Sequence, residues 1–329
     1  MKEIPTVLTS DELTNKVLKK AASVTVKQTG NKLADEKNLV HAKIDCVEAN
    51  LVQTLARYER TFPVIEKLSP FEKELVDILI GCEELHHSLA AIKWCSQTVR
   101  KIGKEVREKL RRSNLKELEK IKKEYYGRVS SVIKQVSPEL NFLNGARNVL
   151  VKIPHIDVTL PTIVIAGFPN VGKSTLVKKI SSAEPEIAPY PFTTKGLIIG
   201  HATLNLVKYQ FIDTPGLLDR PLEERNKIEK QTILALRHLA DIILFLIDPT
   251  GYSGTVDQQE KLLRNLEREF GEAVFIVVET KGDIVKSPTK RLRISAETGE
   301  GLQELVETIK KRFKETKKYR NGLETGKIS

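Results

Sequence analysis

The 329-residue sequence has few of the residues that mark disulfide-rich, metal-stapled or membrane proteins. It contains three cysteines, Cys46, Cys82 and Cys95, and no Cys-x-x-Cys pair. Because His ligands at metal-binding spacing are also missing, we expect reduced, buried thiols and no zinc site. The first ten residues lack an apolar signal-peptide core, and no apolar run approaches the ~18 residues that a membrane helix needs. These absences predict a cytoplasmic protein without membrane contact.

Acidic residues are outnumbered, with 43 Asp and Glu against 54 Lys and Arg, so the formal net charge is +11. Residues 101–128 and 310–329 each carry a net charge of +6, which leaves the rest of the chain almost neutral. Most charge runs are solvated helix faces or frayed ends. Two separate basic segments on an otherwise almost neutral chain make RNA binding about as strong an interpretation as a solvated surface.

Apolar residues in the first half of the chain recur every three or four positions, which is the spacing of one helix face. One stripe runs from Val40 to Tyr58, a second from Phe71 to Ile92 and a third from Leu115 to Ile133. Thr9 with Glu12 and Ser69 with Glu72 form capping-box patterns, which predict helix starts. Successive amphipathic helices of this kind predict an antiparallel bundle.

From about residue 158, short β-branched runs alternate with helical stretches. This alternation predicts an α/β domain, with a mostly parallel sheet and helices on both faces. The two-residue link Asn205-Leu206 predicts one antiparallel hairpin at a sheet edge. We expect an all-α helical-bundle domain over 1–157, the α/β domain over 158–315 and a basic tail over 316–329. The predicted strands are 162–166, 198–204, 207–213, 242–248, 273–278 and 291–295.

Residues 167–174 match the phosphate-loop pattern G-x-x-x-x-G-K-[ST] and stand directly after a predicted strand and before a predicted helix. In such a loop, backbone N–H groups point at the β-phosphate and the helix N-terminus adds positive potential. Lys173 is expected to bridge the β- and γ-phosphates, and the Ser174 hydroxyl to bind Mg²⁺. The predicted phosphate-binding residues are Gly167, Phe168, Pro169, Asn170, Val171, Gly172, Lys173, Ser174 and Thr175.

A second apolar run ends in the D-x-x-G pattern of nucleotide switches. Asp213 is expected to face the Mg²⁺ water shell and is a better metal-binding acid than Asp248, while the Gly216 amide would sense the γ-phosphate. Thr194 is expected to complete the Mg²⁺ sphere, so the predicted metal set is Ser174, Thr194 and Asp213. The predicted switch residues are Thr193, Thr194, Asp213, Thr214, Pro215 and Gly216.

Residues 280–283, Thr-Lys-Gly-Asp, resemble the N-K-x-D motif that reads guanine. Asp283 would accept hydrogen bonds from guanine N1–H and the 2-amino group, which adenine does not offer in this geometry. Lys281 would lie over the ring, and Thr280 replaces the usual Asn, which puts affinity in doubt more than base identity. Residues 295–297, Ser295, Ala296 and Glu297, match the S-A element whose backbone N–H reads guanine O6.

The motifs together resemble the Obg-related GTPases and, more narrowly, the Nog (nucleolar G protein) family. The similar stretches are 4–13, 188–196, 212–226 and 237–249, so they span both predicted domains. The resemblance implies a helical domain ahead of a GTPase domain, and a switch factor in large ribosomal subunit assembly that contacts ribosomal RNA or the pre-ribosomal large subunit. Nucleolar members extend well past this C-terminus, so the chain resembles the archaeal branch.

The expected reaction is attack of water on the γ-phosphate of GTP, which yields GDP, assisted by Lys173, Thr194, Gly216 and Mg²⁺. Many GTPases place Gln directly after D-x-x-G, but this chain has Leu217, so we expect slow intrinsic turnover. Asn170 matches GTPases that use K⁺ instead of an arginine finger, which suggests K⁺-stimulated hydrolysis. A ribosomal partner acting in trans, or a turn-forming role for Asn170, are the alternatives.

Two other functions fit parts of the sequence. A P-loop ATPase or kinase would share the phosphate loop, but Asp283 and the Ser295-Ala296 element argue against both. An RNA-binding assembly scaffold with a structural nucleotide would share the basic segments. Its test is whether RNA affinity changes between GDP and a non-hydrolysable GTP analogue.

Overall fold

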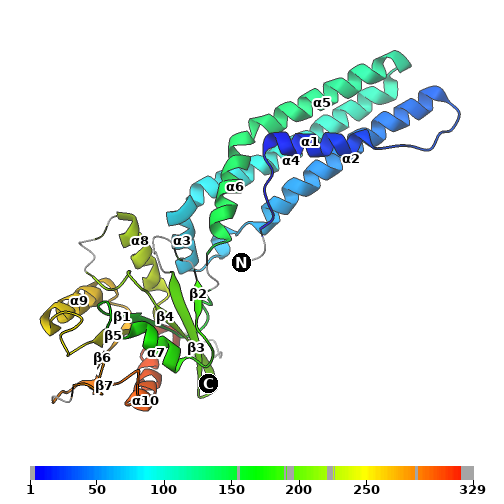
Figure 1. Ribbon diagram of the computed structural model, residues 1–329. Helices are drawn as coiled ribbons and strands as arrows, with labels where there is room; N and C mark the ends of the chain where they lie inside the picture. Colours follow the sequence, from blue (N-terminus) through cyan, green and yellow to red (C-terminus); the bar gives the residue numbers. More distant parts are fainter. Residues whose placement is uncertain are drawn as a thin grey trace. The chain divides into compact units, whose positions relative to one another are not determined.

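The computed structural model describes residues 4–153, 156–188, 190, 196–220, 225, 227–285 and 288–319, without the side chains of Ile228 and Thr232 (Figure 1). The chain forms two compact units, one of residues 1–68 and 80–151 and the other of residues 69–79 and 152–329. No helix in the described part of the chain is long and apolar enough to cross a membrane.

The first unit is a bundle of long helices, as the apolar stripes predict. Thr9 and Glu12 form the expected capping box at its first helix. The buried residues of the second helix include the whole stripe from Val40 to Tyr58. The third stripe is buried from Leu118 onward. The helices are α1 (Ser10–Ala22), α2 (Lys32–Thr61), α4 (Cys82–Arg112), α5 (Leu118–Gln135) and α6 (Ser137–Leu150), with 3₁₀ turns at Ile65–Lys67 and Leu115–Glu117.

The stripe from Phe71 to Ile92 is divided between two helices and two cores. Gly81 has a φ of +80°, which glycine adopts readily, and it ends α3 (Pro70–Ile80) just before α4 begins. Phe71 and Leu75 lie in the core of the second unit, whereas Ile92 is buried on α4 in the first. The α3 helix therefore belongs to the second unit, although it precedes the predicted domain boundary near residue 157 in the sequence.

The second unit is built on a seven-stranded sheet in the order β2-β3-β4-β1-β5-β6-β7. All neighbours pair in parallel except β3, which is antiparallel to both β2 and β4. The predicted hairpin is confirmed, because Asn205 and Leu206 both have positive φ between β3 and β4. Its expected place at the sheet edge is wrong, because the edge is formed by β2, which was not predicted and pairs with β3. The strands are β1 (Thr162–Ala166), β2 (Glu186–Ala188), β3 (Leu197–Leu204), β4 (Val207–Asp213), β5 (Ile242–Ile247), β6 (Val274–Glu279) and β7 (Leu292–Arg293).

Helices cover both faces of this sheet, as expected for an α/β domain. Along β1 the side chains alternate: Ile163 and Ile165 join one apolar cluster, Val164 and Ala166 the other. The first cluster is closed by α7 (Lys173–Ile180) and α10 (Leu302–Phe313), and the second by α3, α8 (Lys227–Ala235) and α9 (Val256–Glu269). The carboxyl ends of β1, β4, β5 and β6 therefore meet at one edge, where α/β folds bind ligands.

The start of the expected basic tail is attached to the sheet domain. Lys318 donates a hydrogen bond to the Leu160 carbonyl and pairs with Asp241, both at 2.7 Å. The Tyr319 ring packs edge-on against Phe313, with 5.8 Å between ring centroids. The described part of the domain thus continues beyond residue 315, and residues 320–329 lie outside the description.

Candidate nucleotide-binding site

The loop between β1 and α7 curls tightly against the sheet. Gly167 has a φ of +138°, and a Cβ atom there would lie 2.6 Å from the Leu246 carbonyl oxygen. The Lys173 ammonium donates to the Gly167 and Phe168 carbonyls, each at 2.8 Å. Burial lowers the pKa of Lys173, and the carboxylate of Asp213 opposes that shift. A cation is therefore held inside the loop, where phosphate oxygens can replace its carbonyl partners.

An oxygen-rich corner lies beside this cation. The Ser174 hydroxyl donates to Asp213 Oδ2 at 2.5 Å, and Asp213 is fully buried at the end of β4. The other carboxylate oxygen, Asp213 Oδ1, has no hydrogen-bond partner among the described residues, and burial raises the pKa of this group. A buried, unpaired carboxylate oxygen next to a hydroxyl fits a hard divalent cation such as Mg²⁺. Thr193 and Thr194 lie outside the described residues.

A pocket of about 500 Å³ opens over these groups. Asn170 lines it with an exposed side chain and a φ of +63°, a conformation that Asn adopts more readily than most residues. Val171 instead points into the core, and Thr214 is buried with its hydroxyl 3.4 Å from the Ile165 carbonyl. The lining residues are Pro169, Asn170, Gly172, Lys173, Ser174, Thr175, Asp213, Pro215, Gly216 and Asp219.

The chain after the D-x-x-G glycine returns to the phosphate loop. Leu217 and Leu218 are each 1% exposed and belong to the sheet core, while the Gly167 N–H donates to the Leu218 carbonyl at 3.2 Å. Arg225 is buried and donates to the Gly216 carbonyl at 2.6 Å and to the Asp219 carboxylate at 2.9 Å. The described part of this segment is therefore joined to the phosphate loop at Leu218, and Arg225 folds back onto the segment itself.

The loop after β6 is fixed through its lysine. The Lys281 ammonium lies 2.6 Å from Asp248 Oδ2 and 5.6 Å from the Tyr252 ring centroid. Burial raises the pKa of Asp248, but hydrogen bonds from Lys281, Thr250 and Ser253 outweigh it, so the pKa lies below its usual value. This contact places the lysine beside an exposed aromatic ring at the edge of the site.

Thr280 and Asp283 occupy different environments within this loop. Thr280 is buried, and its hydroxyl donates to the Ile247 carbonyl at 3.3 Å, so it binds the neighbouring strand. Asp283 is exposed, which leaves its carboxylate accessible to a base. The Gly282 N–H donates to the Ile294 carbonyl at 3.0 Å and so joins this loop to the segment 295–297.

The Ser295 segment forms a compact turn after β7. The Thr298 N–H donates to the Ser295 hydroxyl at 3.2 Å, and Ser295 is buried. Ala296 is partly buried and Glu297 is exposed. The two segments expected to read the base are thus adjacent.

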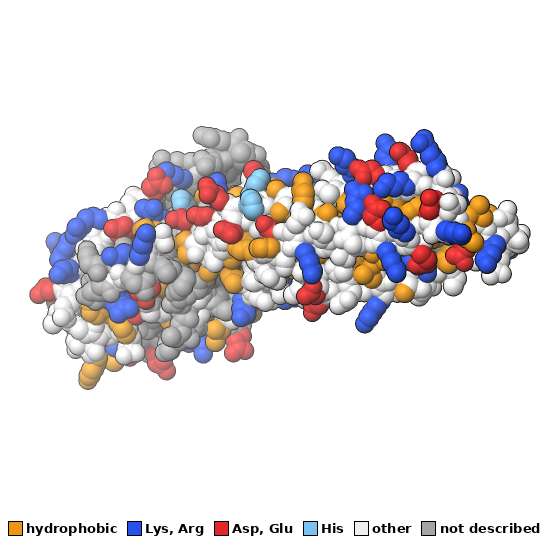
Figure 2. Space-filling view, turned by 90° about the horizontal axis from the view of Figure 1, so that it is seen from above, with side chains coloured by type: hydrophobic (Ala, Val, Ile, Leu, Met, Phe, Trp, Pro, Cys, Tyr) orange, Lys and Arg blue, Asp and Glu red, His pale blue; other side chains and the backbone are white. Residues whose placement is uncertain are grey.

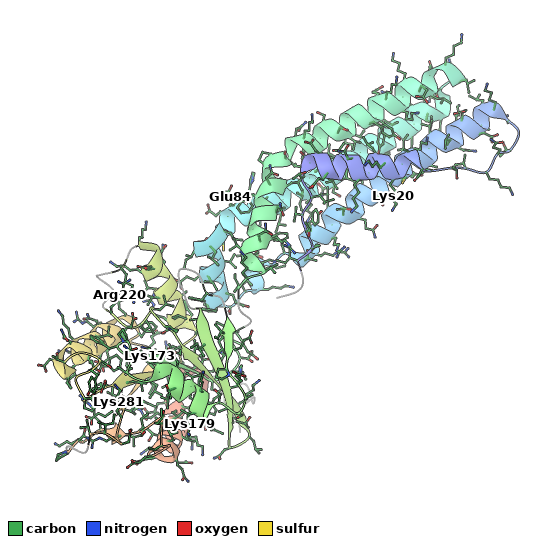
Figure 3. All side chains as sticks on the ribbon, viewed as in Figure 1. Lys20, Glu84, Lys173, Lys179, Arg220 and Lys281 are labelled. Carbon is green, nitrogen blue, oxygen red and sulfur yellow. The ribbon has the colours of Figure 1, made fainter. Side chains whose placement is uncertain are left out.

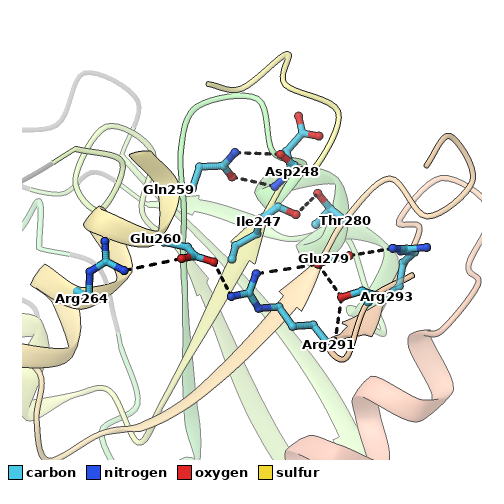
Figure 4. Close-up of polar contacts among 10 residues, drawn as sticks. Ile247, Asp248, Gln259, Glu260, Arg264, Glu279, Thr280, Arg291 and Arg293 are labelled. Atoms are coloured by element: carbon cyan, nitrogen blue, oxygen red, sulfur yellow. Dashed lines mark hydrogen bonds and ion pairs between the residues drawn. The ribbon is translucent and has the colours of Figure 1, made fainter. Parts of the chain in front are cut away.

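A charged network supports the base loop from the side (Figure 4). Glu279, at the end of β6, accepts from Thr289 at 2.7 Å and from Arg293 at 3.0 Å. Arg291 bridges Glu279 to Glu260 on α9, at 4.0 and 2.7 Å. Because Glu279 directly precedes Thr280, these contacts hold the loop relative to α9 and β7.

Models of known protein families match both halves of the chain. The model of the "NOG1 N-terminal helical domain" matches residues 1–157, and that of the "50S ribosome-binding GTPase" matches residues 162–281. An uncharacterized protein of Methanocaldococcus jannaschii is 41% identical over 295 residues, which cover 86% of this chain and 81% of that protein. The chain belongs to the Nog-type GTPases, in their archaeal branch.

Longer relatives carry a specific name. Nucleolar GTP-binding protein 1 of Saccharomyces cerevisiae is 32% identical over 289 residues, which cover 87% of this chain but 45% of that protein. The Nog-type chain thus spans less than half the length of this relative. A crystal structure described as nucleolar GTP-binding protein 1 of Plasmodium falciparum has 32% identity and a TM-score of 0.45, covering 53% of this chain and 97% of that one.

The Nog-type fold brings most of the predicted site residues to one strand edge, in a phosphate group around Lys173 and a base group around Asp283. Sequence reasoning missed Asp219 and Arg225. A charged pair within residues 217–226 was visible, but nothing local in the sequence indicates that Arg225 folds back onto Gly216. The support of the base loop by Glu279 was missed for the same reason.

Proposed function

We propose that this Nog-type chain binds GTP at the strand edge and hydrolyses it slowly to GDP in a Mg²⁺-dependent reaction. The observation that carries the proposal is the buried group of Lys173, Ser174 and Asp213 at the start of α7 and the end of β4. A cation and an unpaired carboxylate oxygen so placed match the two charges that a nucleotide phosphate and its metal ion require. Asp283 and the Ser295 segment supply the preference for guanine.

The residues of the chain would act mainly by positioning. Lys173 would neutralise phosphate charge, and the Gly216 amide would meet the γ-phosphate once GTP is bound. Ser174, Asp213 and Thr194 would hold Mg²⁺, which supplies further neutralisation of the β- and γ-phosphates. Stimulation by K⁺ through Asn170 remains a prediction, tested by comparing turnover in KCl and NaCl; equal rates would exclude it.

The first experiment is titration of the protein with GDP, GTP, ADP and ATP, for wild type and Asp283→Asn. Guanine preference in wild type, shifted towards xanthine nucleotides by the variant, would support the base-reading aspartate. Asp257→Asn, the same change at an exposed carboxylate in the first turn of α9, is the matched control. Equal binding of adenine nucleotides by wild type would refute the GTPase assignment.

We further propose that the chain is a cytoplasmic switch factor in large ribosomal subunit assembly that binds ribosomal RNA. Support comes from the family description "50S ribosome-binding GTPase" and from the nucleolar name of its relatives. Figure 2 shows Lys and Arg side chains gathered over the right-hand end of the view, on the helical domain. Phosphate contacts by such cations supply most sequence-independent RNA affinity.

A groove in the helical domain offers a defined place for an RNA backbone. It has a volume of about 760 Å³, and α1, α2, α6 and the segment 4–8 contribute to it. No carboxylate side chain appears among the described residues that line it. Lys20, labelled in Figure 3, lies 2.5 Å from the Asn50 side-chain oxygen. The polar lining residues are Thr6, Lys16, Lys20, Asn50, Gln53, Thr54, Arg57, Tyr58 and Arg147.

This groove differs from both basic segments of the sequence, because carboxylates neutralise part of each segment but none of the described ones lines the groove. In the described part of 310–329, Lys310, Arg312, Lys317 and Lys318 are paired with carboxylates. Within 101–128, four of the eleven cations are likewise paired. Lys16 and Arg57 have exposed side chains in the groove, without a carboxylate partner among the described residues.

The RNA proposal is tested by a matched pair of triple variants. Lys16→Gln, Lys20→Gln and Arg57→Gln empty the groove of exposed charge, whereas Lys104→Gln, Lys116→Gln and Lys120→Gln remove equal charge from the segment 101–128. Binding to a ribosomal RNA fragment is measured against salt concentration. We expect the groove variant to reduce the slope of log K against log salt by about 2, and the control variant by less. Equal losses would refute the groove, and no binding by wild type would refute the RNA role.

A further inference from the structure

The Nog-type chain lacks a water-orienting glutamine, because Leu217 occupies that position and is buried. Leu217 and Leu218 are each 1% exposed and pack into the sheet core, so neither side chain faces the phosphate pocket. The next residue, Asp219, lines the pocket together with Lys173, Ser174 and Gly216. The chain therefore presents a carboxylate two residues after the position of the usual glutamine.

Asp219 is a carboxylate of the pocket that is not part of the proposed metal site. Among the described lining residues only Asp213 and Asp219 carry carboxylates, and Asp213 is engaged by the Ser174 hydroxyl. Asp219 is not occupied in this way, because it accepts from the guanidinium of Arg225 rather than from a hydroxyl or from the ammonium of the loop. Its side chain is 16% exposed, so it is accessible to a water in the pocket.

Arg225 makes this arrangement rigid. Its side chain is 1% exposed, and its two terminal nitrogens donate to Asp219 Oδ1 at 2.9 Å and to the Gly216 carbonyl at 2.6 Å. A free carboxylate would be repelled by a triphosphate, and a buried guanidinium offsets that repulsion. The same side chain joins Asp219 to the glycine expected to sense the γ-phosphate.

We infer that Asp219 is a catalytic residue of GTP hydrolysis, which orients the attacking water by accepting its hydrogen bond, and that Arg225 is the positioning residue that holds Asp219 and Gly216 together. This inference rests on the proposed GTPase activity. The water oxygen bonds to the γ-phosphorus as the bond to the β–γ bridging oxygen breaks, and that oxygen leaves on GDP with the electron pair. One water proton stays on the inorganic phosphate, and the other passes through the Asp219 carboxylate to solvent.

The test is single-turnover GTP hydrolysis by the full chain, with GDP and GTP affinities measured on the same samples. We expect Asp219→Ala to lower the rate about a hundredfold, the low end for a proton-accepting group, with GDP affinity within threefold. Asp219→Asn, which keeps the shape and loses the acceptor charge, should also be slow. The control is Asp257→Asn, an exposed carboxylate in the first turn of α9.

A double-mutant cycle separates positioning from structure. Arg225→Ala should slow hydrolysis in wild type but cost little more in the Asp219→Ala background, and Arg225→Lys should recover part of the rate. Wild-type rates in both Asp219 variants would refute the inference, as would loss of GDP binding in Asp219→Asn, which would show a structural role. Absence of turnover in wild type would refute the GTPase proposal itself.

Discussion

Replacing Leu75 by alanine should destabilise the GTPase domain, although the residue lies between two helices of the helical domain in the sequence. Leu75 is 1% exposed on α3 and belongs to the core cluster that includes Leu217 and Phe245. Removing three carbon atoms costs about 2.4 kcal/mol in transfer free energy, and the cavity raises the loss to about 3 kcal/mol. That loss corresponds to roughly a 150-fold change in the opening equilibrium.

The assay is native-state hydrogen exchange read by mass spectrometry, with Leu85→Ala as the matched control. Leu85 belongs to the same apolar stripe and is 0% exposed, but it is buried on α4 in the helical domain. We expect Leu75→Ala to accelerate exchange in β1 and β5 by about two orders of magnitude and to leave α4 unchanged, since opening free energies are local to each unit. Leu85→Ala should do the reverse. Faster exchange in α4 alone after Leu75→Ala would refute the assignment of α3.

Three further outcomes are expected. Gly167→Ala should weaken GDP binding by about tenfold or more, because its Cβ would lie 2.6 Å from the Leu246 carbonyl oxygen. The control is Gly145→Ala, whose Cβ meets nothing within 4 Å and which should leave the GDP affinity measured by calorimetry unchanged. Glu279→Gln should raise the Kd for GDP several-fold by releasing Arg291 and Arg293, whereas the exposed Glu267→Gln should not, and equal effects would contradict the support role. The pKa of Asp248 lies below its usual value, so its charge stabilises the fold above the unfolded pKa of about 4 and the benefit disappears as pH falls through the folded pKa. The stability difference between wild type and Asp248→Asn in urea should therefore be constant from pH 7 to 5 and shrink below pH 4, and a difference unchanged at low pH would contradict this reasoning.

Local signals were enough to predict much of the fold. Short apolar, β-branched runs located β1, β4 and β5, and the Asn205-Leu206 link located the hairpin, because these features depend on neighbouring residues only. The capping box at Ser69 also formed as expected. What the sequence did not reveal was the destination of α3: the apolar spacing continues across Gly81, and periodicity does not say against which core a face is buried.

The same limit applies to the sites. The phosphate loop is a contiguous motif, so its residues were named from spacing alone. The Asp219–Arg225 pair depends on how the chain turns after two buried leucines, and the cations of the groove come from three helices and from positions 16, 20, 57 and 147. Contacts of this kind are set by tertiary packing, which a single sequence does not display.

The position of α3 has a consequence for synthesis on the ribosome. Ile80 leaves the ribosome about 170 residues before β5, whose side chains share the core with Phe71 and Leu75. At roughly 5–20 residues per second, the apolar face of α3 waits on the order of ten to thirty seconds for that core. The helices on either side of α3 can pack against each other during this time. The nascent chain therefore carries α3 with its apolar face exposed until the core of the GTPase domain forms.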